Sequence, residues 1–507
     1  MTEPAPIDLD RLDLGSFAGQ PVTVLGLARS GIALCRFLVD RGALVTAYDG
    51  RPAEELADQL ALLEGRTVRI MAGPDIDPRA VLDGQALVCT SPSINSRYPT
   101  TEPRLRRALA DLETAGQVPL VSEVDLFLRL CPSPTVGVTG TKGKTTTSSL
   151  IAAVLGGASQ PVVLGGNIGI PLVEQLPELT TDQRVVLELS ELQLPTISRG
   201  TDVGVYTHVT SDHLDRHGTL DAYRAAKRRL AELVPPGGRL VLNAEDQVSF
   251  AFGAAGRAEV VSYRRSEPAA GGVGVRDGWI VADGLERLPL AGGGVAMTGP
   301  GGRVMPLDEI GLPGRHNTSN VLAAVATGLL FGVSPDAIRR AVAGFMGVEH
   351  RLEPVAVIGG VLFVNDSQGT QPDAVIAALN AFEPPIVLIC GGRSKGVPID
   401  GLAAEVARRA AAAVLVGESA AEMEAAFSAA GARHVERAPS LEAAVSRADE
   451  IARAVLAATG ARRATVLLSP AAASFDMFTD YAARGAVFKE AVGALATMAE
   501  AAGWGRP

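Results

Sequence analysis

The chain has 507 residues, which at roughly 150 residues a domain predicts about three domains. Its 46 Lys and Arg against 56 Asp and Glu give a formal net charge of −10, which argues against nucleic acid as the main partner. A hydrophobic content of 47% with 20% charged residues is typical of a globular protein rather than a disordered one.

Four cysteines lie far apart without a CxxC pair, which excludes a disulfide scaffold and a cysteine-rich zinc site. The first 17 residues are acidic and lack the apolar core of a secretory signal. No stretch reaches the roughly 18 uninterrupted apolar residues of a membrane span. We therefore expect a soluble, cytoplasmic protein that has no membrane partner.

Short Val/Ile/Leu-rich runs alternate with Ala-rich, helix-like stretches along the chain. This alternation predicts an α/β protein in which crossover helices join parallel strands. The first part holds expected strands at 21–27 and 43–49 around a helix at 30–42. It closes near the CPSP sequence at 131–134, whose prolines disfavour a continuing helix. We place the first domain at 1–132.

The second part of the chain, which we place at 133–346, starts with an expected strand at 135–140 and reaches a helix-like stretch at 317–332. Between about 252 and 305 it becomes Gly-rich, and RDG and ADG turn signals separate short apolar runs. This texture predicts β-hairpins inserted in or appended to the domain. Further strands are expected at 184–191, 201–209 and 238–246.

The third part, placed at 347–507, repeats the alternation of strand and helix. Each of its apolar runs is followed by a helix-like stretch, which again predicts a parallel sheet. The expected strands are 360–366, 385–392, 412–418 and 464–470.

Residues 140–145 read Gly-Thr-Lys-Gly-Lys-Thr between an apolar run and a helix-like stretch. Small residues let backbone N–H groups converge on phosphate oxygens, a lysine reaches the β- and γ-phosphates, and a hydroxyl binds Mg²⁺. The first glycine of the strict pattern is displaced, because Val138 holds its place and Gly137 precedes it. The complete strand–loop–helix context favours a nucleotide phosphate loop over a simple Gly-rich turn.

A second glycine pattern lies near the start of the chain. Gly26 and Gly31 have the spacing of the outer glycines of GxGxxG, and Asp49 ends the next expected strand. The middle position is Ala28, where the pyrophosphate of a dinucleotide normally requires no side chain. A tight turn without a ligand and a site for a nucleotide other than NAD both stay open, whereas an NAD-dependent dehydrogenase is disfavoured.

Carboxylates and histidines follow two of the expected strands of the second domain. Glu188 ends an apolar run, where it could hold hydrated Mg²⁺ or be an ordinary solvated edge residue. Lys227 lies on a later helix-like stretch, where by itself it is typical of a solvated lysine. Four possible metal ligands crowd together after the strand at 201–209: Asp212, His213, Asp215 and His217.

A series of motifs resembles the Mur ligases, in the same order along nearly the whole chain. They are GVTGTKGKTTT (137–147), GGNIGIP (165–171), LELSELQL (187–194), TSDHLDRHGTLDAYRAAK (210–227), GRHN (314–317), HRLE (350–353), NDS (365–367) and SPAAASFDMF (469–478).

The resemblance implies a three-domain α/β fold, with a Rossmann-like N-terminal domain, a central P-loop ATPase-like parallel-sheet domain and a Rossmann-like C-terminal domain. It implies an ATP- and Mg²⁺-dependent, amide-forming ligase of peptidoglycan synthesis. The closing motif looks most like the members that add D-glutamate to UDP-N-acetylmuramoyl-L-alanine through an acyl phosphate. We expect a monomer that acts on these two small-molecule substrates.

The resemblance also implies site residues, grouped here by what they would contact. ATP would contact Gly140, Thr141, Lys142, Gly143, Lys144, Thr145, Thr146, Asn317, Arg351 and Asp366. Catalytic roles would fall on Lys144, Glu188, His213 and Lys227, and metal binding on Thr145, Glu188, His213 and Lys227, the last as a carbamate. The UDP substrate would contact Asp49, Arg51, Ser91, Asn167 and Gln193. The incoming amino acid would contact Thr370, Lys395, Ser474, Phe475 and Tyr481.

Some positions depart from the family pattern. Gln368 stands where a lysine is common, which removes a positive charge near a site meant for a dicarboxylic amino acid, and Arg393 could compensate. Ser93 replaces a usual glycine and Ala472 a common cysteine. The alternatives are another Mur-type ligase, for example one adding L-glutamate, a folylpolyglutamate-type enzyme, or a non-catalytic, nucleotide-binding ligase-like subunit. The joint presence of the catalytic set disfavours the last.

Overall fold

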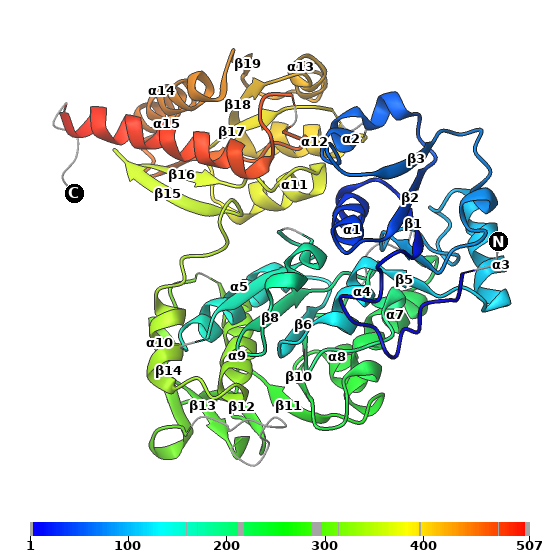
Figure 1. Ribbon diagram of the computed structural model, residues 1–507. Coiled ribbons are helices and arrows are strands. Elements are labelled where there is room, and N and C mark those ends of the chain that lie inside the picture. Colours follow the sequence, from blue (N-terminus) through cyan, green and yellow to red (C-terminus); the bar gives the residue numbers. More distant parts are fainter. Residues whose placement is uncertain are drawn as a thin grey trace. The chain divides into compact units, whose positions relative to one another are not determined.

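The computed structural model describes residues 4–158, 160–169, 171–210, 217–285, 297–312, 314–394, 397–474 and 476–501. The chain divides into two compact units, residues 1–345 and 346–507. Within the described residues, the first unit contains a five-stranded and a nine-stranded sheet, and the second contains a six-stranded sheet (Figure 1). The predicted α/β class is confirmed.

The five-stranded sheet is entirely parallel, with the order β3-β2-β1-β4-β5. The strand order reverses between β1 and β4, and doubly wound sheets bind ligands at the carboxyl ends of strands at such a point. Its strands are β1 (Pro21–Leu25), β2 (Leu44–Asp49), β3 (Val68–Ala72), β4 (Leu87–Thr90) and β5 (Leu120–Ser122). The helices around it are α1 (Arg29–Asp40), α2 (Ala57–Ala61), α3 (Pro103–Ala115) and α4 (Glu123–Leu130).

The nine-stranded sheet has the order β14-β13-β12-β11-β10-β9-β6-β8-β7, and it is parallel from β7 to β12. Its parallel strands are β6 (Thr135–Thr139), β7 (Val162–Gly166), β8 (Arg184–Glu188), β9 (Val203–Tyr206), β10 (Arg239–Asn243), β11 (Glu259–Tyr263) and β12 (Gly272–Arg276). The associated helices are α5 (Lys144–Gly156), α7 (Leu220–Leu233), α8 (Gln247–Ala251), α9 (Arg315–Leu330) and α10 (Pro335–Ala343).

The Gly-rich segment extends the edge of this sheet. β13 (Trp279–Asp283) pairs antiparallel with β12 and with β14 (Arg303–Pro306), as the hairpin prediction required. Asp277 and Gly278 make the β12–β13 turn with φ of 50° and 73°, the left-handed pair that a tight hairpin needs. The hairpin interpretation is wrong for β11, which lies in the same segment but runs parallel to β10.

Helices α5 and α9 cover one face of the nine-stranded sheet, where their apolar side chains form a buried cluster with strand residues such as Val136 and Val205. The other face contributes Leu187 and Leu240 to a cluster that continues into the first sheet through Val24. Because this core is shared, the two sheets belong to one compact unit. The division into domains 1–132, 133–346 and 347–507 stays a prediction.

The second unit is built on a sheet with the order β15-β16-β20-β17-β18-β19, parallel except for the antiparallel edge strand β15. Helices α14 and α15 cover one face, and α11 and α12 cover the other (Figure 1). The strands are β15 (Glu353–Ile358), β16 (Val361–Asn365), β17 (Ile386–Gly391), β18 (Ala410–Val416), β19 (Val435–Arg437) and β20 (Ala464–Leu468). The helices are α11 (Pro372–Ala381), α12 (Asp400–Arg409), α13 (Ala420–Ala429), α14 (Leu441–Thr459) and α15 (Tyr481–Ala501).

In the part of the chain that the structure describes, no helix combines the length and the apolar character needed to cross a bilayer.

Candidate active site

The phosphate loop connects β6 to α5, as the sequence predicts. Gly140 and Gly143 have φ of 152° and 87°, a backbone region that favours glycine. A Cβ on Gly140 would lie only 1.9 Å from Oγ1 of Thr207, so a side chain has no room there. That hydroxyl donates a hydrogen bond to the carbonyl of Lys142, at 2.7 Å. The loop is therefore held against the segment that follows β9.

Lys144 is the first residue of α5, and its side chain bends back over the loop. Its Nζ donates to the carbonyl oxygens of Gly140 and Thr141, both at 3.1 Å. Thr145, the next residue, is buried in the first turn of the helix. The free backbone N–H groups and the dipole of a helix N-terminus favour an anion, and a lysine at the same point adds a full charge.

Glu188 ends β8, the strand beside β6, and it is buried at 2% exposure. The alternative that Glu188 is a solvated edge residue is therefore wrong. Asn167 holds it twice, because its backbone N–H donates to the Glu188 carbonyl at 2.8 Å and its Nδ2 donates to Oε1 at 2.8 Å. Oε2 is buried and has no hydrogen-bond partner among the described residues. Such a carboxylate oxygen suits a hard cation.

Lys227 lies on α7 and is fully buried, so the expectation of a solvated lysine is wrong. Its Nζ donates to Oγ1 of Thr139, the last residue of β6, at 3.3 Å. Nζ also lies 3.8 Å from Oε2 of Glu191. One turn earlier on α7, the hydroxyl of Tyr223 shares a hydrogen bond with Oγ1 of Thr141 at 2.8 Å. Helix α7 thus brings Lys227 next to the phosphate loop.

Glu191 is a buried residue that the sequence analysis did not single out. It lies within the LELSELQL motif, which was the available signal. His213 lies outside the described residues, as do Asp212 and Asp215. His217 is described, and its ring makes edge-on contacts with Tyr98 and Tyr223. The described ranges contain no group of three or more His, Cys, Asp or Glu arranged to hold a metal ion.

A pocket of about 470 Å³ opens beside the phosphate loop. On its α9 side, Asn320 accepts from the hydroxyl of Thr147 at 3.2 Å and donates to Oδ1 of Asn317 at 3.0 Å. Asn320, which the sequence analysis did not name, lines the pocket, and the predicted residue Asn317 is hydrogen-bonded to it. The lining includes Lys142, Gly143, His208, Asn243, Tyr263, His316 and Asn320.

A second pocket, of about 450 Å³, lies at the carboxyl end of the five-stranded sheet and is lined in part by Asp49 and Arg51. Asp49 accepts from the backbone N–H of Leu27 at 2.8 Å and from Nη2 of Arg51 at 2.8 Å. Burial favours a higher pKa for Asp49, but the hydrogen bonds from Arg51 and the backbone outweigh it and hold the pKa below its usual value. A carboxylate and a guanidinium thus face this pocket together.

The turn after β1 closes this end of the sheet. A Cβ on Gly31 would lie 1.6 Å from the carbonyl oxygen of Gly26, so the turn itself requires glycine there. Ser91 lies behind the turn, where its Oγ is buried without a hydrogen-bond partner in the described part of the chain. Arg29, which sequence reasoning missed, donates to the carbonyl of Gly169 at 2.8 Å. This contact ties the first turn to the loop that carries Asn167.

Gln193 is buried in the loop after β8. Its Oε1 accepts from the backbone N–H of Ser190 at 2.9 Å and from the Ser190 hydroxyl at 3.0 Å. The side-chain carbonyl of Gln193 is thus used to hold its own loop.

Asp366 and Arg351 belong to the second unit. Asp366 follows β16 and is buried, accepting from the hydroxyl of Ser469 at 2.7 Å and from the backbone N–H of Leu352 at 3.1 Å. Burial raises the pKa of Asp366 to about 6. Arg351 is exposed between His350 and Leu352, whose φ values of 62° and 46° are left-handed. Strained backbone of this kind is often stored at functional sites.

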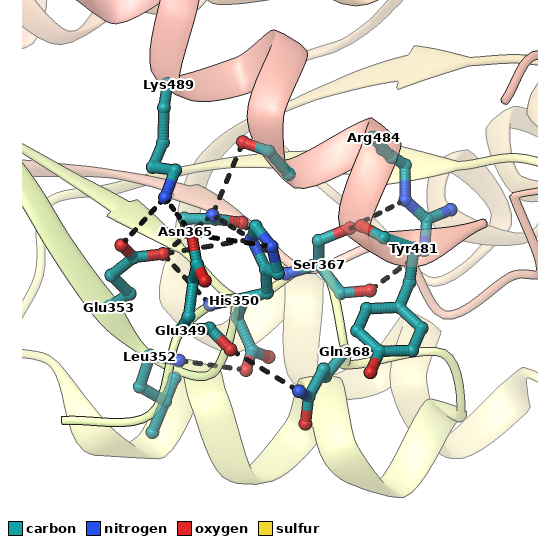
Figure 2. Close-up of polar contacts among 12 residues, drawn as sticks. Glu349, His350, Leu352, Glu353, Asn365, Ser367, Gln368, Tyr481, Arg484 and Lys489 are labelled. Atoms are coloured by element: carbon teal, nitrogen blue, oxygen red, sulfur yellow. Dashed lines mark hydrogen bonds and ion pairs between the residues drawn. The ribbon is translucent and has the colours of Figure 1, made fainter. Parts of the chain in front are cut away.

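A polar network holds the turn around Arg351 (Figure 2). Nδ2 of Asn365 lies 2.9 Å from Nδ1 of His350 and donates to Oε2 of Glu353 at 2.9 Å. Burial lowers the pKa of His350, which favours the neutral ring that can accept this hydrogen bond. Lys489 of α15 contacts Oε1 of Glu353 at 3.3 Å. The turn is thus fixed from β16, β15 and α15.

Two of the residues predicted to bind the incoming amino acid, Thr370 and Ser474, lie on loops that follow the carboxyl ends of β16 and β20. The loop with Thr370 meets the loop with Ser474 where Ala471 donates to the Gly369 carbonyl at 2.8 Å. Tyr481 begins α15, and its carbonyl accepts from the Ser367 hydroxyl at 2.7 Å. The remaining two, Lys395 and Phe475, lie outside the described residues.

Gln368, which departs from the family pattern, and Arg393, which could compensate for it, both belong to the second unit. Nε2 of Gln368 donates to the carbonyl of Glu349 at 3.4 Å (Figure 2). Arg393 lies with its Nε 3.6 Å from Oε2 of Glu418, so its charge is already paired.

Comparison with known proteins identifies the class. Residues 138–328 match the Mur ligase middle domain, and residues 350–472 match the glutamate ligase domain of Mur ligases. The chain belongs to the Mur ligases, as its motifs predicted. Its curated relatives include the UDP-N-acetylmuramoylalanine–D-glutamate ligase of Symbiobacterium thermophilum, 40% identical over 475 residues that cover 93% of this chain and 97% of the relative. The enzyme of the same name from Roseiflexus sp. is 37% identical over 497 residues, covering 94% and 98%.

A solved structure shares the fold of this chain. It is the UDP-N-acetylmuramate–alanine ligase of Thermotoga maritima, which matches with a TM-score of 0.50 at 16% identity and covers 94% of this chain and 100% of its own.

Proposed function

We propose that this chain is an ATP-dependent ligase that joins D-glutamate to UDP-N-acetylmuramoyl-L-alanine in peptidoglycan precursor synthesis, as a monomer in the cytoplasm. The observation that carries the proposal is the alignment of the phosphate loop, the buried Glu188 and the buried Lys227 at one end of the nine-stranded sheet. The names of relatives that match over nearly the full chain support the choice of D-glutamate.

The reaction requires activation, because a carboxylate is a poor electrophile. The alanyl carboxylate attacks the γ-phosphate of ATP, which gives an acyl phosphate and ADP. The amine of D-glutamate then attacks the acyl carbon, and inorganic phosphate leaves from the tetrahedral intermediate. Lys144 offsets the charge that develops on the phosphoryl oxygens, and the loop residues Gly140, Thr141, Lys142, Gly143 and Thr146 orient the phosphates.

The residues present fit a Mg²⁺ ion, because Glu188 offers a buried carboxylate oxygen without a hydrogen-bond partner in the described ranges. We assign the ion to Thr145, Glu188, His213 and Lys227, the last as a carbamate. When bound, the cation neutralises phosphate charge during transfer. Asn167 keeps Glu188 in position for this role.

We assign the remaining ligands to residues of the three proposed domains, 1–132, 133–346 and 347–507. The pocket at Asp49 and Arg51, with Ser91 behind it, is assigned to the uridine diphosphate. The muramoyl-alanine moiety is assigned to Asn167 and Gln193, and the nucleotide to Asn317, Arg351 and Asp366. The incoming amino acid is assigned to Thr370, Lys395, Ser474, Phe475 and Tyr481.

Phosphate release tests the proposal. Purified protein is incubated with UDP-N-acetylmuramoyl-L-alanine, ATP and Mg²⁺ and with D-glutamate, L-glutamate or meso-diaminopimelate in turn. Of the three acceptors, we expect only D-glutamate to support phosphate release. Release with L-glutamate instead would show that the acceptor is L-glutamate. No release with any acceptor would favour the alternative of a non-catalytic, nucleotide-binding subunit. Oxygen-18 in the substrate carboxylate should appear in the released phosphate, and its absence would exclude the acyl phosphate.

A further inference from the structure

Arg484 is a buried arginine on α15 that none of the roles above uses. Only 1% of its surface is exposed, and no carboxylate of the described residues forms an ion pair with it. Burial lowers the pKa of Arg484 to about 10, against an opposing influence from Asp476. Burying an arginine without an ion pair is costly, so its hydrogen bonds must be satisfied by other groups.

The guanidinium obtains these hydrogen bonds from two loops. Its Nε donates to the hydroxyl of Ser367 at 3.0 Å, and Nη2 donates to the Ser367 carbonyl at 2.9 Å (Figure 2). Nη1 donates to the carbonyl of Ala472 at 3.2 Å. A Cβ on Gly392 would lie 3.3 Å from Nη1, so a third loop also packs against the guanidinium.

These three loops follow the carboxyl ends of β16, β20 and β17. The first carries Thr370 and the second carries Ser474, both assigned to the incoming amino acid, and the third carries Arg393. Through Ser367 and Ala472, Arg484 fixes the backbone of the loops on which Thr370 and Ser474 stand.

We propose that Arg484 is a positioning residue for the acceptor site, which joins the loops after β16 and β20 and thereby sets the affinity for the incoming amino acid. The proposal rests on the proposed function, since it takes these loops as the binding site for D-glutamate. The planar fork of arginine suits this role, because it donates in several fixed directions at once. A lysine places its donors at one point and does not span two loops.

The test is Arg484→Lys, which keeps the positive charge and loses the fork. We expect the KM for D-glutamate to rise about tenfold or more, with the KM values for ATP and UDP-N-acetylmuramoyl-L-alanine within about twofold of the unaltered protein. A purely structural role would lower the amount of active protein and leave all three KM values unchanged. The matched control is Arg447→Met, which removes an exposed arginine of α14 from the same unit.

Ser367→Ala keeps the test decisive if Arg484→Lys does not fold, because it removes one acceptor and leaves the arginine in place. We expect it to raise the KM for D-glutamate by a smaller factor in the same direction. The proposal is overturned if neither folded variant raises this KM, or if the KM for ATP rises equally. Failure of the proposed function looks different, because the unaltered protein would then release no phosphate with any acceptor.

Discussion

Asn167 fixes Glu188 through both its backbone and its side chain. Its N–H donates to the carbonyl of Glu188 and its Nδ2 donates to Oε1, each at 2.8 Å. The side-chain hydrogen bond occupies one carboxylate oxygen, whereas Oε2 is buried and has no hydrogen-bond partner among the described residues. The orientation of the Glu188 carboxylate, and with it the position of Oε2, therefore depends on the loop that carries Asn167.

Replacing Asn167 with alanine should weaken Mg²⁺ binding more than it weakens the fold. Without Nδ2 the carboxylate can rotate, and loss of a group that orients a metal ligand typically costs about 10-fold to 100-fold in affinity or activity. The measurement is a Mg²⁺ titration of phosphate release at saturating substrates. Gln183→Ala is the matched control, since the side chain of Gln183 accepts a hydrogen bond from the nearby N–H of Thr180. An unchanged Mg²⁺ requirement in Asn167→Ala would contradict the assignment of Glu188.

Replacing Lys144 with methionine should lower kcat by about 100-fold to 1,000-fold. The ammonium bonds only loop carbonyls in the described structure, so its loss removes charge from the phosphate site without disturbing the sheet. Circular dichroism and the melting temperature should stay as in the unaltered protein. Arg79→Met, which removes an exposed arginine of the first unit, serves as control. Phosphate release near the normal rate in Lys144→Met would refute the role.

The sequence was most informative where the residues of a site are contiguous in the chain. Residues 140–145 form a loop between a strand and the helix that follows it directly, so spacing alone located Lys144 at a helix N-terminus. The burial of Lys227 could not be predicted from sequence spacing. Its partners Thr139 and Glu191 come from β6 and the loop after β8, and only tertiary packing brings α7 against them.

The same limit explains the errors in the fold. Glycine-rich texture indicated turns between 252 and 305, but it did not reveal that β11 would pair with β10, because pairing direction depends on the neighbouring strand. Arg484 shows the same limit. The sequence analysis did not single it out, and its burial follows from contacts with Ser367 and Ala472 on loops distant in the sequence.

Replacing Lys227 with arginine separates two roles for this residue. Nζ lies 3.8 Å from a Glu191 oxygen, so an ammonium is attracted there, whereas a carbamate would be repelled unless a cation lay between them. Arginine keeps the positive charge but does not react with carbon dioxide to form a carbamate. We expect both Lys227→Arg and Lys227→Met to lose activity by about 100-fold or more.

The check on Lys227 combines turnover with a carbon-13 spectrum of the unaltered protein in labelled bicarbonate, where a carbamate signal should appear. Arg228→Lys, on the exposed side of the same helix, is the control and should keep full turnover. Activity retained in Lys227→Arg, together with no carbamate signal, would mean that the ion pair with Glu191 suffices.

We expect Glu123 to make the stability of the first unit depend on pH. It begins α4 and is buried at 4% exposure, and in the described part of the chain its side chain accepts one long hydrogen bond, from the N–H of Val173 at 3.3 Å. Burial raises the pKa of Glu123 from 4.5 to about 7. The folded protein therefore binds a proton that the unfolded chain releases between these two values, so stability falls as the pH rises from 4.5 to 7. The full penalty, about 3 kcal/mol, is present above that range.

Glu123→Gln should remove this penalty, because glutamine keeps an acceptor for Val173 and carries no charge. We expect the variant to melt at a higher temperature than the unaltered protein at pH 8 and at nearly the same temperature at pH 5. The exposed Glu64→Gln is the matched control and should leave both melting temperatures unchanged. If Glu123→Gln and the unaltered protein lose stability equally between these pH values, the carboxyl is already ionised at neutral pH and is stabilised by its surroundings. Arg29, whose charge opposes the effect of burial on this group, would then be the residue responsible.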